Sequence, residues 1–124
     1  MHIDHINISA PKELLESVKE FYCAIFGLVA GRRPNFSTPG FWLYSGDNAI
    51  IHLMESSEHY SNEKQGYLDH VAYKTTGLKE LVNKLNALNI EYTVNSMPEM
   101  HMSQVFVKDP AGVGVEVKFI NETL

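Results

Sequence analysis

A pattern that recurs after about half the chain constrains the fold of this sequence more than any other feature. Residues 69–73 (Asp-His-Val-Ala-Tyr) repeat the pattern of residues 4–8 (Asp-His-Ile-Asn-Ile) at an offset of 65 residues. Residues 114–118 (Gly-Val-Glu-Val-Lys) correspond to residues 50–54 (Ile-Ile-His-Leu-Met) at an offset of 64 residues. Each run is typical of a strand with one polar group among apolar neighbours. A repeat of this length predicts two copies of one unit, neither of which can bury its apolar face alone.

The repeat places four possible metal ligands at equivalent positions, which are His5, His52, His70 and Glu116. Neutral imidazoles and a carboxylate suit a divalent first-row ion such as iron, manganese, cobalt, nickel or zinc, and the pattern leaves its identity open. His5, His70 and Glu116 alone make a two-histidine, one-carboxylate triad. His52 is either a fourth ligand or a donor that orients a bound water. The alternative is a metal-free protein, in which these side chains are hydrogen-bonded residues of the core or rim.

Each half predicts a strand, a helix and three further strands, which makes an α+β fold of two βαβββ repeats. In the first half we expect strand 2–9, helix 14–26, a short strand within 28–41, and strands 41–44 and 49–54 around a hairpin turn. Pro11 suits the first helical turn and Gly27 the helix stop. In the second half we expect strands 68–74, 90–94, 104–108 and 113–120, a helix over 78–88 that stops at Asn89, a loop over 95–103 and a turn at 109–112.

The length of 124 residues favours one domain, because two separate halves of about 60 residues would bury little surface each. We therefore expect a single domain over 1–124, made of repeats 1–56 and 67–120 and joined by a polar connector at 57–66. This prediction gives one shared core for both copies.

Charge and cysteine content exclude several classes of partner. The net charge is −5 without a basic cluster, so we expect neither nucleic acid nor an anionic membrane as a partner. No run approaches the roughly 20 apolar residues of a membrane helix, and no secretory pattern opens the chain. Cys23 is the only cysteine, which excludes an intramolecular disulfide and fits a reducing cytoplasm.

The repeated Asp-His openings, residues 21–28 (Phe-Tyr-Cys-Ala-Ile-Phe-Gly-Leu) and the Asp-Pro-Ala-Gly turn at 109–112 before a Glu-bearing strand carry a resemblance. The chain resembles the vicinal oxygen chelate superfamily over roughly residues 1–120. That group includes glyoxalase I, extradiol dioxygenases, fosfomycin-resistance proteins, methylmalonyl-CoA epimerase and bleomycin-binding proteins. The resemblance implies an open, curved mixed sheet in two half-barrels that face a shared cleft, a metal held there by the four residues named above, and a homodimer.

By the same resemblance we expect a glyoxalase-like enzyme whose small substrate chelates the metal through vicinal oxygens. An enediolate-like intermediate would form in lyase or isomerase chemistry, with Glu116 or His52 as the base. His52 departs from glyoxalase I and the epimerase, which have Glu or Gln there. Two alternatives stay open: an extradiol-type dioxygenase that keeps the triad with iron, and a metal-free module that binds a cationic drug, as bleomycin-resistance proteins do.

Four further side chains are candidates for substrate binding. Arg33, next to Arg32, can clamp a carboxylate, or it is a solvated loop charge. Trp42 and Tyr44 share a strand parity and can wall a cavity, although aromatic residues in sheets more often serve the core. Gln104 can donate to a substrate oxygen. The sequence does not identify the substrate, and it leaves open whether the halves pair within one chain or across a dimer.

Overall fold

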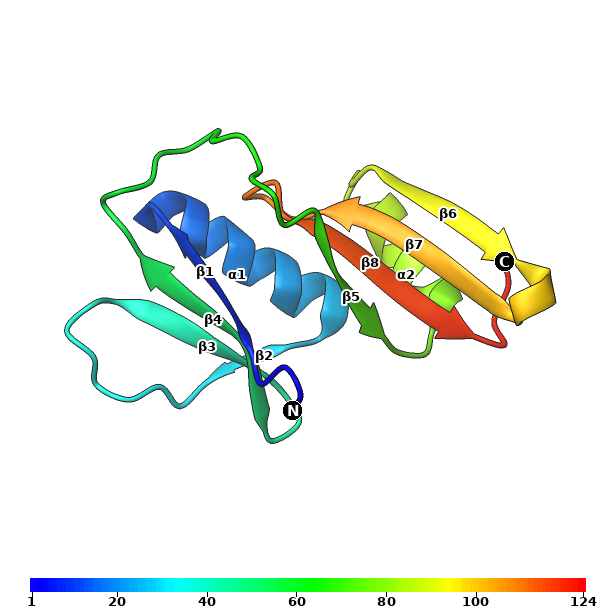
Figure 1. The fold of residues 1–124 in the computed structure, drawn as a ribbon, viewed down its shortest axis with the longest axis horizontal. Coiled ribbons are helices and arrows are strands. Elements are labelled where there is room, and N and C mark those ends of the chain that lie inside the picture. Colours follow the sequence, from blue (N-terminus) through cyan, green and yellow to red (C-terminus); the bar gives the residue numbers. More distant parts are fainter. The chain divides into compact units, whose positions relative to one another are not determined.

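The computed structural model describes residues 1–124 as two compact units, Met1–Glu63 and Lys64–Leu124. Both units have the element order strand, helix and three strands, so the predicted α+β fold of two βαβββ repeats is confirmed (Figure 1). The boundary between the units falls inside the predicted connector 57–66. None of the helices has the length and apolar character needed to cross a membrane.

The first unit is a four-stranded sheet with one helix on its face. Its strands are β1 (Ile6–Ala10), β2 (Val29–Gly31), β3 (Gly40–Ser45) and β4 (Asn48–Glu55), and its helix is α1 (Lys12–Phe26). The strand order is β1-β4-β3-β2, in which β1 runs parallel to β4 and the other pairs are antiparallel. The apolar stripe of α1 is buried against β3 and β4, so this face of the sheet is the core of the unit.

The C-terminal end of α1 is formed as the sequence predicts, and the N-terminal end is not. Gly27 closes the helix in the left-handed region (φ 68°), and its amide donates to the Cys23 carbonyl, as the sequence predicts. Pro11 lies at the N-cap, one residue before the first turn in which we expected it, and no side chain caps this end. Since proline has no amide hydrogen, its place ahead of the helix leaves one fewer donor to satisfy.

The second unit repeats the first. It contains β5 (His70–Lys74), α2 (Leu78–Ala87), β6 (Tyr92–Met97), the 3₁₀ turn η1 (Pro98–Met100), β7 (Met102–Lys108) and β8 (Gly114–Ile120). The strand order β5-β8-β7-β6 matches the order in the first unit, again with one parallel pair at the edge. On β8 the odd-numbered residues Val115, Val117 and Phe119 are buried. The even-numbered residues, Glu116 among them, point to the opposite face.

The start of α2 is capped by a residue near the end of the chain. Gly77 precedes the helix with φ 93°, and it has no side chain to cap it. The Glu122 carboxylate accepts hydrogen bonds from the Gly77 amide (3.0 and 3.1 Å) and from the Leu78 amide (2.8 Å). The C-terminal segment thereby satisfies two amides that would otherwise have no partner, and it brings a negative charge to the positive end of the helix.

Two of the predicted elements differ in the structure. Strand β1 begins at Ile6, so His5 stands just before it. The predicted loop 95–103 is wrong over most of its length, because β6 continues to Met97 and pairs with β7 in an unbroken ladder. His101 takes a left-handed conformation (φ 51°) that turns the chain, and Met102 is buried. The polar composition of this segment concealed a tight hairpin.

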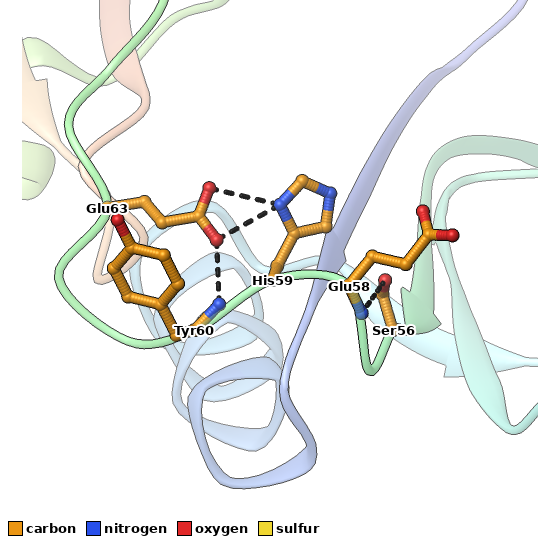
Figure 2. A network of polar contacts seen from close by, with 5 residues as sticks. All are labelled: Ser56, Glu58, His59, Tyr60 and Glu63. Carbon is orange, nitrogen blue, oxygen red and sulfur yellow. Dashed lines mark hydrogen bonds and ion pairs between the residues drawn. The ribbon is translucent and has the colours of Figure 1, made fainter.

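The connector is ordered by its own polar groups, which Figure 2 shows from close by. The Glu63 carboxylate contacts Nδ1 of His59 at 3.0 and 3.1 Å and accepts the Tyr60 amide at 2.6 Å. The Glu58 amide donates to Oγ of Ser56 at 3.2 Å. The Glu63 carboxylate has a lowered pKa, because the hydrogen bonds from His59 and the Tyr60 amide favour its charged form.

Candidate metal site

The four predicted ligands occupy equivalent places in the two parallel strand pairs. His52 on β4 lies opposite Asn7 on β1, and Glu116 on β8 lies opposite Ala72 on β5. His5 and His70 come two residues before Asn7 and Ala72, so each points to the same face as its opposite partner. Each unit therefore brings two of the four side chains together on the sheet face away from its helix.

In the first unit these two side chains form a stack with a third ring. The imidazoles of His5 and His52 lie 3.6 Å apart at 11°, and the indole of Trp42 lies 4.1 Å from His52 at 13°. Burial lowers the pKa of His52, and the nearby His5 and Arg33 lower it further by charge repulsion. His52 is therefore held neutral, which is the form that binds metal ions.

In the second unit Glu116 is fixed by a chain of amides. Nε2 of His70 lies 3.5 Å from Oε1 of Glu116. Nε2 of Gln104 donates to the other oxygen, Oε2, at 3.2 Å, and Nδ2 of Asn95 donates to Oε1 of Gln104 at 3.1 Å. The carboxylate is mostly buried, with 12% of the side chain exposed. One oxygen is thus occupied by Gln104, and the other is directed to His70.

Aspartates next to the two strand-leading histidines orient their rings. Nδ1 of His5 lies 2.7 Å from Asp4, and Nδ1 of His70 lies 2.8 Å from Asp69. A carboxylate that accepts the Nδ1 proton leaves Nε2 with a free lone pair, which is the usual arrangement of a metal-ligating histidine. Sequence reasoning used the two Asp-His pairs only as a repeat marker, although their adjacency already contained this role.

The predicted substrate-binding side chains divide between two environments. Arg33 and Trp42 line a pocket of about 310 Å³ in the first unit, together with His52. Tyr44 does not line this pocket, and its hydroxyl donates to the Arg32 carbonyl.

Gln104 is the fourth of these candidates, and its amide is occupied by Glu116 and Asn95. A second, open pocket of about 950 Å³ lies in the other unit, where His70 and Phe106 meet edge to face at 6.2 Å. Trp42 and Phe106 oppose His52 and Glu116 in the two sheets, so each candidate ligand pair has an aromatic neighbour at the equivalent position.

The donor set fits a divalent metal, since two aspartate-oriented imidazoles, a neutral His52 and a fixed carboxylate oxygen are the groups such ions bind. No group of three or more His, Cys, Asp or Glu side chains that could hold a metal ion comes together in the structure.

Comparison with solved structures decides the fold. A glyoxalase family protein from Bacillus anthracis matches at a TM-score of 0.75 and 23% identity, over 97% of this chain and 95% of that chain. The fosfomycin resistance protein FosX from Listeria monocytogenes matches at 0.73 and 16%, over 100% and 95%. Lactoylglutathione lyase from Agrobacterium tumefaciens matches at 0.68 and 20%, over 95% and 92%.

The chain has the vicinal oxygen chelate fold. The resemblance carried by the repeated Asp-His openings and the turn at 109–112 is therefore confirmed at the level of the fold. The sequence matches no family model and no curated relative. One variant of FosX, at a TM-score of 0.73 and 15% identity over 96% of this chain and 92% of that chain, was solved with Mn(II) and a dihydroxypropylphosphonic acid. In the vicinal oxygen chelate fold many chemistries share one scaffold, so function has to be argued from the side chains.

Proposed function

We propose that this protein is a divalent-metal-dependent enzyme whose metal ligands are His5, His52, His70 and Glu116. Its substrate is a small molecule that presents two adjacent oxygens to the ion, and the reaction is of the lyase or isomerase type. The observation that carries the proposal is the orientation of Nε2 in both strand-leading histidines by Asp4 and Asp69, at 2.7 and 2.8 Å. The pair occurs at the equivalent place in both repeats, and it directs Nε2 of each histidine away from its aspartate.

Solved relatives of the fold support the metal. The FosX variant was solved in complex with Mn(II) and a dihydroxypropylphosphonic acid, which agrees with a divalent ion and a small polar ligand. Another neighbour is a lactoylglutathione lyase, which agrees with lyase chemistry. Iron, manganese, nickel, cobalt and zinc all suit the ligand set, because imidazole and carboxylate do not select strongly among them.

The residues around the site divide the chemical work. The bound ion supplies Lewis-acid stabilisation of negative charge on a substrate oxygen. Glu116 is the candidate base: Gln104 holds its Oε2, so Oε1 would have to leave the ion before it could take a proton from the carbon next to a carbonyl on the way to an enediolate-like intermediate. His52 is the second candidate base, because its lowered pKa leaves it neutral and ready to accept a proton.

Metal analysis tests the proposal. Protein purified without a tag and supplemented with each ion in turn is expected to hold about one ion per chain, with ligand replacement lowering affinity by a factor of ten or more. His70→Ala is the test variant. His59→Ala is the matched control, because His59 lies in the connector and pairs only with Glu63. Stoichiometry near zero for every ion would favour the metal-free, drug-binding alternative.

Turnover assays then separate the enzyme classes. Metal-loaded protein is offered a glutathione hemithioacetal, an epoxide antibiotic and a catechol. Isomerisation of the first, without consumption of oxygen, is the expected outcome. Oxygen uptake with the catechol, dependent on ferrous ion, would replace this assignment by the extradiol dioxygenase.

We also propose a homodimer in a reducing cytoplasm. Sedimentation measures the first part directly. Mixing a His5→Ala/His52→Ala variant with a His70→Ala/Glu116→Ala variant tests whether one site draws ligands from two chains: recovery of metal binding on refolding the mixture shows that it does, and no recovery assigns all four ligands to one chain.

A further inference from the structure

We infer that the pocket at Arg33 binds an oxyanion, so that the substrate is an organic acid whose carboxylate or phosphonate group is gripped by this guanidinium. The inference rests on the proposed function for the identity of the reacting part of the molecule. It adds the chemical class of the substrate and the residue that recognises it.

Arg33 is positioned by contacts that leave its charge unpaired. Its Nη2 donates to the Thr38 carbonyl at 2.9 Å, and its guanidinium carbon lies 4.9 Å from the centre of the Phe36 ring. These contacts fix the plane of the guanidinium within the loop between β2 and β3. Arg33 makes no ion pair, and its Nε is buried without a hydrogen bond in the protein.

An unpaired guanidinium is unusual in a chain with a net charge of −5. The pocket contains no aspartate or glutamate, and its polar lining consists of neutral groups such as Asn7 and Ser37. A half-buried positive charge without an internal anion is costly, and an incoming oxyanion offsets that cost with charge-assisted, two-point hydrogen bonds. The lining therefore selects an anion by charge and by geometry.

Gly40 lies beside the guanidinium of Arg33. A Cβ on Gly40 would collide with the Leu53 carbonyl, so the strand pairing requires glycine here, and Nη2 of Arg33 would lie 3.0 Å from that Cβ. The guanidinium is therefore packed close to the backbone of β3.

The pocket walls indicate the rest of the ligand. Phe36 and Trp42 face each other at 6.2 Å between ring centres, and Trp42 continues into the stack with His52. A volume of about 310 Å³ accepts an acid with a small planar or apolar body. Arg33 and His52 line the same pocket, so the anionic group would lie on the same side as a proposed metal ligand.

Binding of simple acids without metal provides the test. Trp42 is the only tryptophan, so its fluorescence reports on the pocket directly. Benzoate and phenylphosphonate are titrated into the full chain in the presence of a chelator, with benzamide as the neutral counterpart. We expect a saturable change with at least one anion and none with benzamide. The stronger of the two anions identifies the oxyanion that the substrate carries.

Variants at neighbouring arginines make the result specific. Arg33→Gln is expected to weaken anion binding about ten- to a hundredfold, because a hydrogen bond to a charged group contributes about 1.5–3 kcal/mol. Arg33→Met keeps the aliphatic stem and provides a check on folding. Arg32→Gln is the matched control, since Arg32 is exposed and does not line the pocket, and it should bind as the parent does.

The outcomes separate this inference from the proposed function. Equal binding of benzamide, or equal affinity in Arg33→Gln and the parent, overturns the anion site, and so does the absence of a saturable change with both anions. Loss of metal binding in His70→Ala with anion binding intact supports both assignments. Anion binding in a protein that takes up no metal supports the Arg33 site and rejects the metal-dependent enzyme.

Discussion

Gln104 holds one oxygen of Glu116 and is itself held by Asn95. Since Asn95 donates to the Gln104 carbonyl oxygen, the amide group of Gln104 must face the carboxylate and present its hydrogen. The chain of two amides therefore fixes both the position of Glu116 and which of its oxygens stays available. Gln104 would therefore act on a bound metal only through Glu116.

Replacing Gln104 tests that role. Gln104→Leu removes the donor while keeping the approximate volume, so Glu116 gains freedom and metal affinity should fall about tenfold. Asn95→Ala should have a smaller effect in the same direction, because Gln104 loses the hydrogen bond that orients its amide but can still donate to Glu116. Affinity is measured by calorimetric titration, with Ser96→Ala on the same strand as the control. Unchanged affinity in Gln104→Leu would remove Gln104 from the site.

At the scale of an element, β8 can keep its place beside β5 only because residue 114 is glycine. A Cβ there would lie 2.9 Å from Cβ of His70 and would collide with the Asp69 carbonyl. The close approach joins the strand of Glu116 to the residue pair Asp69 and His70. Packing between strands thus sets the geometry of the candidate ligands.

Gly114→Ala should displace the start of β5 and cost about 2 kcal/mol of unfolding free energy, with a parallel loss of metal affinity. Gly112→Ala is the control: its position has φ 83° and open space, so it pays about 1 kcal/mol for backbone strain and leaves the ligands in place. Urea unfolding and metal titration of both variants give the comparison. The same metal affinity in the two variants would contradict the proposed coupling.

The Glu122 cap gives a second prediction at this scale. Glu122→Ala leaves the Gly77 and Leu78 amides without their acceptor and should destabilise the protein by about 1–2 kcal/mol in urea unfolding. Glu122→Gln keeps an acceptor and should lose less. Glu20→Ala, at an exposed position of α1, is the control and should change little.

These elements show which parts of the fold were predictable from sequence. The alternation of Val115, Val117 and Phe119 against Glu116 is a local pattern with period two, and it placed β8 and its faces correctly. Glu122 caps α2 across a sequence separation of 44 residues to Leu78 and 45 residues to Gly77, and no local pattern encodes such a contact. The strands at 90–94 and 104–108 were predicted, but their extension to Met97 and Met102 was not, because the segment between them is rich in polar residues.

At the scale of the site, the four candidate ligands came from the repeat, because duplication makes equivalent positions visible in the sequence. The orienting aspartates were visible without their role being recognised. The stack of Trp42 on His52 depends on the pairing of β3 with β4, and the hydrogen bond of Tyr44 to the Arg32 carbonyl joins residues on either side of a loop. Residue spacing alone determines neither contact.

For the whole molecule, the proposed metal would bind the folded protein more tightly than the unfolded chain, which does not hold the imidazoles and the carboxylate in place. Metal binding should therefore raise the unfolding temperature. The effect depends on pH because the imidazoles must be neutral to bind. Protons compete with the metal for a histidine below its pKa, and the lowered pKa of His52, which comes mainly from burial, favours its neutral, metal-binding form.

We therefore expect the rise in unfolding temperature on metal addition to be large at pH about 7.5 and mostly lost at about 5.5, where protonated histidine prevails. Calorimetry with and without a chelator at both pH values measures the difference. The parent and His59→Ala should behave alike. An equal rise at both pH values would argue for a site built of carboxylates instead of imidazoles.

The matching register of the two parallel strand pairs has a consequence for how such a protein can diversify. Position 52 holds histidine where the other copy holds glutamate at 116, yet the backbone around both is the same. Exchange of a single residue at either place would alter the charge and basicity of the proposed ligand set without disturbing any strand. A lineage built on this plan can explore new reactions one ligand at a time while its architecture is inherited intact.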